Sequence, residues 1–419
     1  MKNKKILLLF GSLAAFISNA QVFTLRDAFA KARTAYPLTG QTQLANEAAN
    51  INIENLHKGY LPQVNLNAQA SYQSDVTRVN IPLPGIKIDP MSKDQYRLTA
   101  DISQLVYDGG TIKKQQQVQK LNAAVEAQKT EVELYKLKER ISQVYLGILL
   151  TDEQLKQTAL VKADINNGIK KVEAQVNNGV AFRSNLNMLK AELLKNEQRV
   201  IELKANRKSL LEVLGILTNE ALDENVQLQK PSEEASTAAL IQRPEIALYD
   251  KQAILFRQQK GLIGSKNLPK ASAFVQGGYG KPGLNMLKNS FEPFAIAGLR
   301  LNWNLGNLYT AKNEKRLAEL NTKNVQLQKE TFLLNNSAQQ KQQQGEIDKL
   351  KQLITADKEI IELRTSIKQA ANAQLENGVI TSSDYLREVN AEDQARELMA
   401  LHELQLVQAI VNLTLLKGQ

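Results

Sequence analysis

The feature that most limits how this chain can fold is a pair of very long helical stretches that resemble each other. The first runs from Ile112 to Asn178 and the second from Ala311 to Asn377, and both end in Asn-Gly-Val. At about 1.5 Å per residue, an unbroken helix of this size would be on the order of 100 Å long. One globular core does not cover such a helix. The sequence therefore predicts helices that need partners along their length.

Each long stretch is followed by a shorter helical stretch. These return stretches run from Asn185 to Leu217 and from Asp384 to Leu416. A break followed by a second helix is typical of a helical hairpin. The chain is therefore expected to contain two long antiparallel helical hairpins.

Comparison of the two copies places the tip of each hairpin. Gly168 follows two asparagines and could also end a helix, but the residue 199 positions later is Ile367, whereas Gly179 recurs as Gly378 at that interval. Glycine supplies the left-handed conformation that commonly ends a helix. We therefore expect the tips at two equivalent sets of residues, namely Asn178, Gly179 and Val180 in the first copy and Asn377, Gly378 and Val379 in the second.

Each copy also contains two segments in which apolar and polar residues alternate, which predicts strands. They are Val64 to Tyr72 and Tyr96 to Val106, with counterparts Ala271 to Tyr279 and Ala295 to Leu305. The parity is the same in both copies, with Phe274 as the one mismatch. An ordinary half-buried sheet is the commoner source of such alternation. Strands of about 10 to 14 residues, with aromatic residues near their ends and a strongly polar second face, favour membrane strands.

The chain divides into four parts. Three lysines, an apolar run and Ser18-Asn19-Ala20 make residues 1–20 a predicted secretory signal, because the apolar run is shorter than the roughly 20 residues that an anchor needs. The first repeat is 21–217, the connector is 218–240 and the second repeat is 241–419. Each repeat has the order helix, strand, strand, long helix, return helix.

Several function classes are excluded. The chain has no cysteine and only two histidines, His57 and His402, which have no partner at ligand spacing. No phosphate loop, nucleophile motif or metal cluster is present, so we predict no enzyme, no cofactor and no catalytic, cofactor-binding or metal-binding residue. The net charge of +10 is spread among acidic residues along helices, which argues against nucleic acid. After residue 20, no stretch contains 18 uninterrupted apolar residues, so the sequence predicts no membrane-spanning helix.

Four strands cannot close into a barrel. In lipid, an open sheet edge leaves unpaired backbone groups that cost several kcal/mol each, so other chains must complete the sheet. Two, three or four chains would give about 8, 12 or 16 strands, and physics alone does not choose among them. The helical hairpins of the same chains would form a second tube continuous with the first. Such an assembly is a conduit.

The chain resembles the TolC family of outer-membrane efflux proteins. The resemblance lies in the duplicated order, the Tyr107-Asp108-Gly109-Gly110 entry to the first long helix, and the two Gly-Val tips. It implies a mainly helical fold with membrane strands: a homotrimer with a 12-stranded barrel in the cell outer membrane, four strands per chain, continuous with a long α-helical barrel in the periplasm. Outer-membrane lipid, a periplasmic adaptor and an inner-membrane transporter are the implied partners.

The resemblance also implies roles for single residues. The two Gly-Val tips match the adaptor-docking tips, and Asp384 matches an acid of the periplasmic gate, together with Asn185, its counterpart in the first copy. Arg387 stands where some members have a second acid, and Ile380 where an arginine latch can occur. Asp384 also suits the first turn of a helix, where a carboxylate is stabilised. The sequence therefore leaves two interpretations of Asp384, a residue of the gate and a helix cap.

The expected function is that of a passive exit duct in a tripartite efflux system, which conducts small molecules exported by an inner-membrane transporter. One alternative is the outer-membrane component of type I protein secretion, which differs only in cargo. A second is a periplasmic coiled-coil scaffold that forms no channel.

Overall fold

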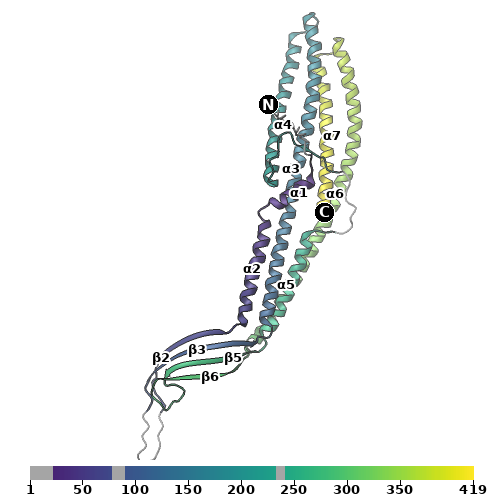
Figure 1. The fold of residues 1–419 in the computed structure, drawn as a ribbon. Coiled ribbons are helices and arrows are strands. Elements are labelled where there is room, and N and C mark those ends of the chain that lie inside the picture. The colour runs from purple at the N-terminus through teal and green to yellow at the C-terminus, as the bar shows by residue number, and fades with distance from the viewer. Residues whose placement is uncertain (1–21, 78–89, 233–240) are drawn as a thin grey trace, which may run out of the picture. The chain divides into compact units, whose positions relative to one another are not determined.

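A computed structural model describes residues 22–77, 90–232 and 241–419 (Figure 1). The predicted secretory signal lies outside the described residues, as do residues 78–89, between two of the predicted strands, and part of the connector. The helices are α1 (Leu25–Ala35), α2 (Thr39–His57), α3 (Thr111–Asn177), α4 (Arg183–Thr218), α5 (Pro244–Lys266), α6 (Asn307–Glu376) and α7 (Ser382–Lys417). The strands are β1 (Val22–Phe23), β2 (Gln63–Tyr72), β3 (Asp94–Tyr107), β4 (Gln227–Leu228), β5 (Lys270–Lys281) and β6 (Glu292–Asn302), and a 3-10 turn, Lys58–Tyr60, follows α2.

The chain forms two compact units, and each unit takes segments from both predicted repeats. Unit 1 consists of the residues up to Thr39, Leu134–Arg243 and Asn336–Gln419. Unit 2 consists of Gly40–Glu133 and Pro244–Asn335. The long helices α3 and α6 therefore each contribute to both units. The boundaries of the repeats themselves remain a prediction.

The sheet of unit 2 is antiparallel, with strand order β2-β3-β5-β6. The predicted apolar positions share one face, since Leu66 pairs with Ala100, Ala100 with Gly277, and Gly277 with Ala295. This face is exposed, with 77% of Leu66 and 84% of Leu299 accessible to solvent. In an ordinary half-buried sheet the apolar face packs on a core, so the exposed face favours the membrane interpretation.

The opposite face of the sheet carries a polar network. Asp101 accepts hydrogen bonds from the Asn67 amide at 3.0 Å and the Gln276 amide at 2.5 Å. The mismatched Phe274 lies opposite Gly298, and the Arg300 guanidinium stands 4.6 Å from its ring centroid. A side chain at Gly298 would crowd that ring, since a Cβ there would lie 3.1 Å from it. Glycine and arginine together therefore accommodate an aromatic ring on a polar face.

The residues Asp108-Gly109-Gly110, which precede α3, are suited to start this helix. Asp108 accepts hydrogen bonds from the backbone N–H of Gly110 at 2.8 Å and of Ile112 at 2.7 Å, which caps the helix start. Gly109 has φ +69°, and a Cβ on it would lie 2.7 Å from Leu268. In the second copy, Leu308-Tyr309 replaces the two glycines, and α6 is already helical there. The two strand-to-helix turns therefore differ.

Both long helices continue through the sequences that could have broken them. Helix α3 passes Gly168, and α6 passes the glutamine-rich run Asn335 to Glu346. Val125, Ile141 and Ile148 form part of the buried apolar side of α3. Pro244 begins α5, a position where its missing amide hydrogen costs nothing, whereas Pro37 lies in the turn before α2.

The largest apolar cluster of unit 1 surrounds Tyr145 of α3, which is completely buried. Its hydroxyl donates to the backbone oxygen of Phe23 at 2.6 Å and lies 2.8 Å from that of Gln229. These two segments form the short parallel pair β1 and β4. The sequence analysis did not predict α1, β1 or β4, although Thr24 and Asp27 form the capping box of α1.

One helix in the described part of the chain, α7, is long and apolar enough by composition to cross a membrane. The sequence analysis applied a stricter test, which counted uninterrupted apolar residues. The apolar residues of α7 pack inside unit 1, where Leu404, Val407 and Ile410 are buried in its clusters. Core packing therefore accounts for the composition of α7.

Candidate functional site: the hairpin tips

The two hairpin tips in unit 1 end their first helices in the same way. In the first tip, Gly179 has φ +74°, its N–H donates to Val176 O at 3.1 Å, and the N–H of Val180 donates to Gln175 O at 2.8 Å. The second tip repeats the pattern with Gly378 at φ +69°. This is the Schellman arrangement, in which a left-handed glycine lets the chain cover the last carbonyls of a helix. The predicted tips are confirmed as helix ends.

The tips expose apolar side chains. Val180 and Val379 are each 71% exposed, and Phe182 is 79% exposed. Large apolar side chains exposed together are a common mark of a protein interaction surface. Phe182 was not among the predicted site residues, and it stands 199 positions before Thr381.

The helices that leave the two tips begin differently. Phe182 precedes α4 and makes no side-chain capping bond. Thr381 precedes α7, and its hydroxyl oxygen accepts the N–H of Asp384 at 3.3 Å while Asp384 accepts the N–H of Thr381 at 3.2 Å. This reciprocal pair is a capping box. The structure therefore shows the cap role for Asp384, and the gate role remains a prediction.

Asp384 and Arg387 lie together on α7. The Thr381 hydroxyl and N–H, followed by the charge of Arg387, hold the pKa of Asp384 below its usual value. Arg387 Nη1 stands 3.5 Å from Asp384 Oδ1, and Arg387 Nε donates to Glu388 Oε1 at 3.2 Å. Asn185 lies on the other hairpin, in the first turn of α4, and takes no part in this pair. Ile380 is only partly exposed and packs against the apolar cluster beneath the tips.

Polar contacts join the two tips. Lys171 of α3 pairs with Glu376 of α6 at 2.8 Å and donates to the side-chain oxygen of Asn372 at 3.1 Å. The Gln175 amide donates to Leu375 O at 2.6 Å. The ends of α3 and α6 are therefore held side by side.

Below the tips, Gly168 allows α7 to approach α3 closely. Tyr385 is 2% exposed, and a Cβ at Gly168 would lie 2.9 Å from its ring. The Tyr385 hydroxyl donates to Asp164 O at 3.1 Å, and burial raises the pKa of Tyr385 to about 12. Gly168 is therefore a packing residue and not a turn residue.

A charged network lies next to this contact. Glu392 of α7 is 3% exposed and is paired with both Lys368 and Arg396, while Lys368 also pairs with Asp164 of α3 at 2.8 Å. Burial alone would raise the pKa of Glu392, but hydrogen bonds from Lys368, Thr365 and Arg396 outweigh it and lower that pKa to about 2. The network joins the second hairpin to the first hairpin.

Comparisons with known proteins identify the fold. Residues 31–219 match the model of the family described as outer membrane efflux protein. This match covers 189 of the 419 residues. No curated protein sequence matches the chain.

Solved structures of outer-membrane channels share the fold of this chain. It is similar to the CmeC outer membrane channel of Campylobacter jejuni, at 15% identity and TM-score 0.65, with 94% of this chain and 85% of that chain covered. It is similar to the outer membrane protein VceC of Vibrio cholerae at 15% identity and TM-score 0.66, with coverages of 93% and 94%. It is also similar to the open MtrE channel of Neisseria gonorrhoeae, at 14% identity and TM-score 0.66, with 94% of this chain and 88% of that chain covered.

These comparisons confirm the TolC-like fold class predicted from the sequence. The match of residues 31–219 agrees with the predicted outer-membrane efflux class and outer-membrane location. The matched family is a family of channels and not of enzymes. The family model covers the first repeat, while the structural likeness extends over both.

The sequence analysis missed the charged network and the buried pair of His402 and Asp357. His402 Nδ1 lies 2.6 Å from Asp357 Oδ2, so this histidine links α7 to α6. A spacing of one helical turn between Glu392 and Arg396 could have indicated an ion pair. The contacts of Glu392 with α6 required the tertiary structure.

Proposed function

We propose that the chain forms the outer-membrane exit duct of a tripartite efflux system. In this proposal three copies build the duct, a periplasmic adaptor docks at the hairpin tips, and an inner-membrane transporter supplies the energy. Small molecules then pass through passively. The observation that carries the proposal is a sheet with an exposed apolar face and two unpaired edges in one chain.

The sheet edges require other chains. Strands β2 and β6 form the two edges of the four-stranded sheet. In lipid, each unpaired backbone group costs several kcal/mol, so edges must be paired. Pairing β6 of one copy with β2 of the next satisfies both edges, and three copies give 12 strands.

The helices of unit 2 support association of copies. Leu320, Leu327 and Leu334 of α6 are 47%, 52% and 71% exposed, and they recur every seven residues. Leu44 and Ile51 of α2 are 66% and 53% exposed at the same spacing. A repeat of seven keeps side chains on one helix face and is typical of helices packed along their length. These stripes fit contacts between neighbouring copies.

Spin labels test the duct arrangement. Labels at Leu66 and Asn67 occupy adjacent positions on opposite faces of β2, so in membranes we expect the first to be accessible to oxygen in lipid and the second to a water-soluble relaxation agent. The assembly should have three times the mass of one mature chain in detergent. Equal surroundings for the two labels, a monomer, or a protein soluble without detergent would contradict the proposal, and the last result would favour a periplasmic scaffold.

We infer that Asp384, Arg387 and Asn185 contribute to the periplasmic mouth of this duct. Arg387 has 70% of its side chain exposed. Arg387→Glu changes the charge by two in each copy, so the single-channel conductance or its sensitivity to cations should change. An unchanged single-channel record would remove the gate assignment.

We further infer that the tips, Asn178 to Val180 and Asn377 to Val379, dock the adaptor. Val379→Asp places a charge on this apolar surface and should reduce export, while the conductance of the isolated duct stays unchanged. Val379→Thr has nearly the same shape and serves as the control. Normal export by the Asp variant would contradict docking at this tip.

A further inference from the structure

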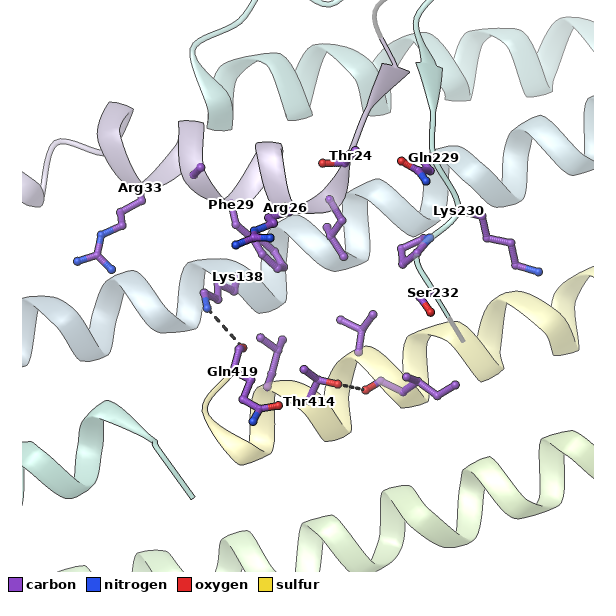
Figure 2. A pocket seen from close by; sticks show the side chains of 16 residues that line it. Thr24, Arg26, Phe29, Arg33, Lys138, Gln229, Lys230, Ser232, Thr414 and Gln419 are labelled. Carbon is purple, nitrogen blue, oxygen red and sulfur yellow. Dashed lines mark hydrogen bonds between the residues drawn. The ribbon is translucent and has the colours of Figure 1, made fainter. Parts of the chain in front are cut away.

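A cavity in unit 1 lies away from the hairpin tips and has no role in the proposed duct. It has a volume of about 730 Å³ and is lined by 16 residues (Figure 2). Helix α1 forms one wall, α7 forms the opposite wall, α3 contributes Lys138, and Gln229–Ser232 close one end. Its size falls within the range of about 300–1,000 Å³ that is usual for small-molecule sites.

Most of the wall is apolar. Phe29 and Leu25 of α1 face Ile410, Val411 and Leu415 of α7 across the cavity. An apolar chain between these walls would be removed from water, which is worth about 0.8 kcal/mol for each buried CH₂ group. The cavity can therefore bind a hydrocarbon chain.

The charged side chains of the lining are all cationic. Arg26, Arg33, Lys138 and Lys230 line the cavity, and no carboxylate side chain is among its lining residues. Lys230 is paired with Glu403 outside the lining, at 3.3 Å. Figure 2 shows Arg26 and Phe29 on the face of α1 that looks toward Lys138.

Lys138 is in an unusual environment for a cation. Its amine lies 5.6 Å from the ring centroid of Phe29 and 4.8 Å from that of Tyr135, and it donates to the backbone oxygen of Gln419 at 3.4 Å. Burial, followed by the charge of Arg33, lowers the pKa of Lys138. An anion beside Lys138 would relieve both effects, because it would partner the buried charge.

We propose that this cavity binds an amphipathic carboxylate, with its hydrocarbon chain between α1 and α7 and its carboxylate at Lys138 and Arg26. A neutral hydrocarbon would add apolar atoms beside the partly buried ammonium of Lys138 without partnering its charge, which is unfavourable. A small inorganic anion would leave the apolar walls in water. A long-chain fatty acid satisfies both parts of the cavity.

Photolabelling of the full mature protein in nanodiscs of zwitterionic lipid tests this proposal. A fatty acid with a diazirine on its chain should label peptides from α1 and from the last turns of α7. Dodecanoate should compete for this labelling, whereas dodecanol, which has the same chain and no charge, should compete at least tenfold more weakly. Equal competition by the two compounds, or labelling confined to the membrane sheet, would overturn the proposal.

Two pairs of variants separate the cavity from general effects. Ala30→Trp fills the cavity from α1 and should reduce labelling at least tenfold, while Ala35→Trp, on the same helix and outside the lining, should not. Lys138→Met should weaken competition by dodecanoate about tenfold, or about 1.4 kcal/mol, and leave that by dodecanol unchanged. Lys156→Met, at an exposed position of α3, is its control. Retained labelling in folded Ala30→Trp would contradict the proposed binding site. If a variant does not assemble, the competition between dodecanoate and dodecanol on the wild-type protein decides whether the proposal holds.

Discussion

The charged network at Glu392 offers a sharp test of what holds the two hairpins together. Glu392→Gln keeps the shape of the side chain and removes its charge. Arg396 Nη2 then donates to a neutral amide in place of the carboxylate that it now meets at 2.7 Å, and Thr365 loses a charged partner at 2.6 Å. Lys368 keeps Asp164 at 2.8 Å. The ion pair with Asp164 therefore limits the loss of stability in Glu392→Gln.

The size of the effect follows from the pKa of Glu392, which folding lowers from 4.5 to about 2. One pKa unit corresponds to about 1.36 kcal/mol, so the charged form contributes about 3 kcal/mol at pH 7. Breaking a buried ion pair costs about 3–5 kcal/mol. Because Lys368 retains one partner, we expect Glu392→Gln to cost about 2–3 kcal/mol at pH 7.

The pH dependence has a definite sign. A lowered pKa gives stability that is fully present above the unfolded value and is lost as the pH falls toward the folded value. For Glu392 this loss of stability should occur between pH 4.5, its usual pKa, and about pH 2, its pKa in the folded protein. About 1 kcal/mol of its contribution should remain near pH 3. The difference in thermal stability between the wild type and Glu392→Gln should therefore shrink below about pH 5.

Hydrogen exchange gives the local measurement. At pH 7, amides of α7 between residues 382 and 396 should exchange roughly 30- to 150-fold faster in Glu392→Gln. Glu153→Gln is the control, because Glu153 forms an exposed pair with Lys156, and such pairs contribute about 0–1 kcal/mol. Wild-type exchange in Glu392→Gln, or a stability difference that is the same at pH 7 and pH 3, would refute the reasoning.

Three further substitutions test single contacts. Gly168→Ala pushes a methyl group against the buried ring of Tyr385. Overpacking costs about 1–3 kcal/mol, while the better helix propensity of alanine stabilises the helix by about 1 kcal/mol, so the melting temperature should fall. A higher melting temperature would show that the ring can move. Gly378→Ala meets no neighbouring atom but keeps φ +69°, so its cost of about 1–2 kcal/mol should appear as faster proteolysis at the tip only, with the melting temperature unchanged. Tyr145→Phe removes one of two hydrogen bonds to the backbone oxygen of Phe23, which keeps the N–H of Gln229 at 3.1 Å. The loss should cost about 0.5–1.5 kcal/mol in thermal unfolding, and an unchanged stability would mean that water replaces the hydroxyl.

The elements predicted well from the sequence are those set by local periodicity or by the duplication. The strands followed from alternation, and register confirms that Leu66, Ala100, Gly277 and Ala295 share one face. The tips followed from the recurrence of Gly179 as Gly378. Duplication helped because a glycine that recurs at the same interval indicates a backbone requirement common to both copies.

The elements that were missed depend on contacts between distant segments. β1 and β4 are two residues long, and their pairing is held by Tyr145, more than 80 residues from either one along the chain. No periodicity can indicate such short strands. The role of Gly168 was also hidden, because its reason is the ring of Tyr385 on another helix. Helix α1 is different, since the capping box at Thr24 was present in the sequence.

The two tips differ only where their sequences have diverged. Their C-terminal caps share the hydrogen bonds made by the N–H groups of the Gly and the Val, so the backbone requirement at the Gly is the same in both. At the following N-cap, Thr381 forms a capping box, whereas Phe182 forms no capping bond and leaves 79% of its surface in water. A good N-cap contributes about 1 kcal/mol, and an exposed aromatic residue gains nothing in the isolated chain. Because sites that break a local rule without a structural gain are often functional, the exposure of Phe182 supports the proposal that the first tip docks a partner.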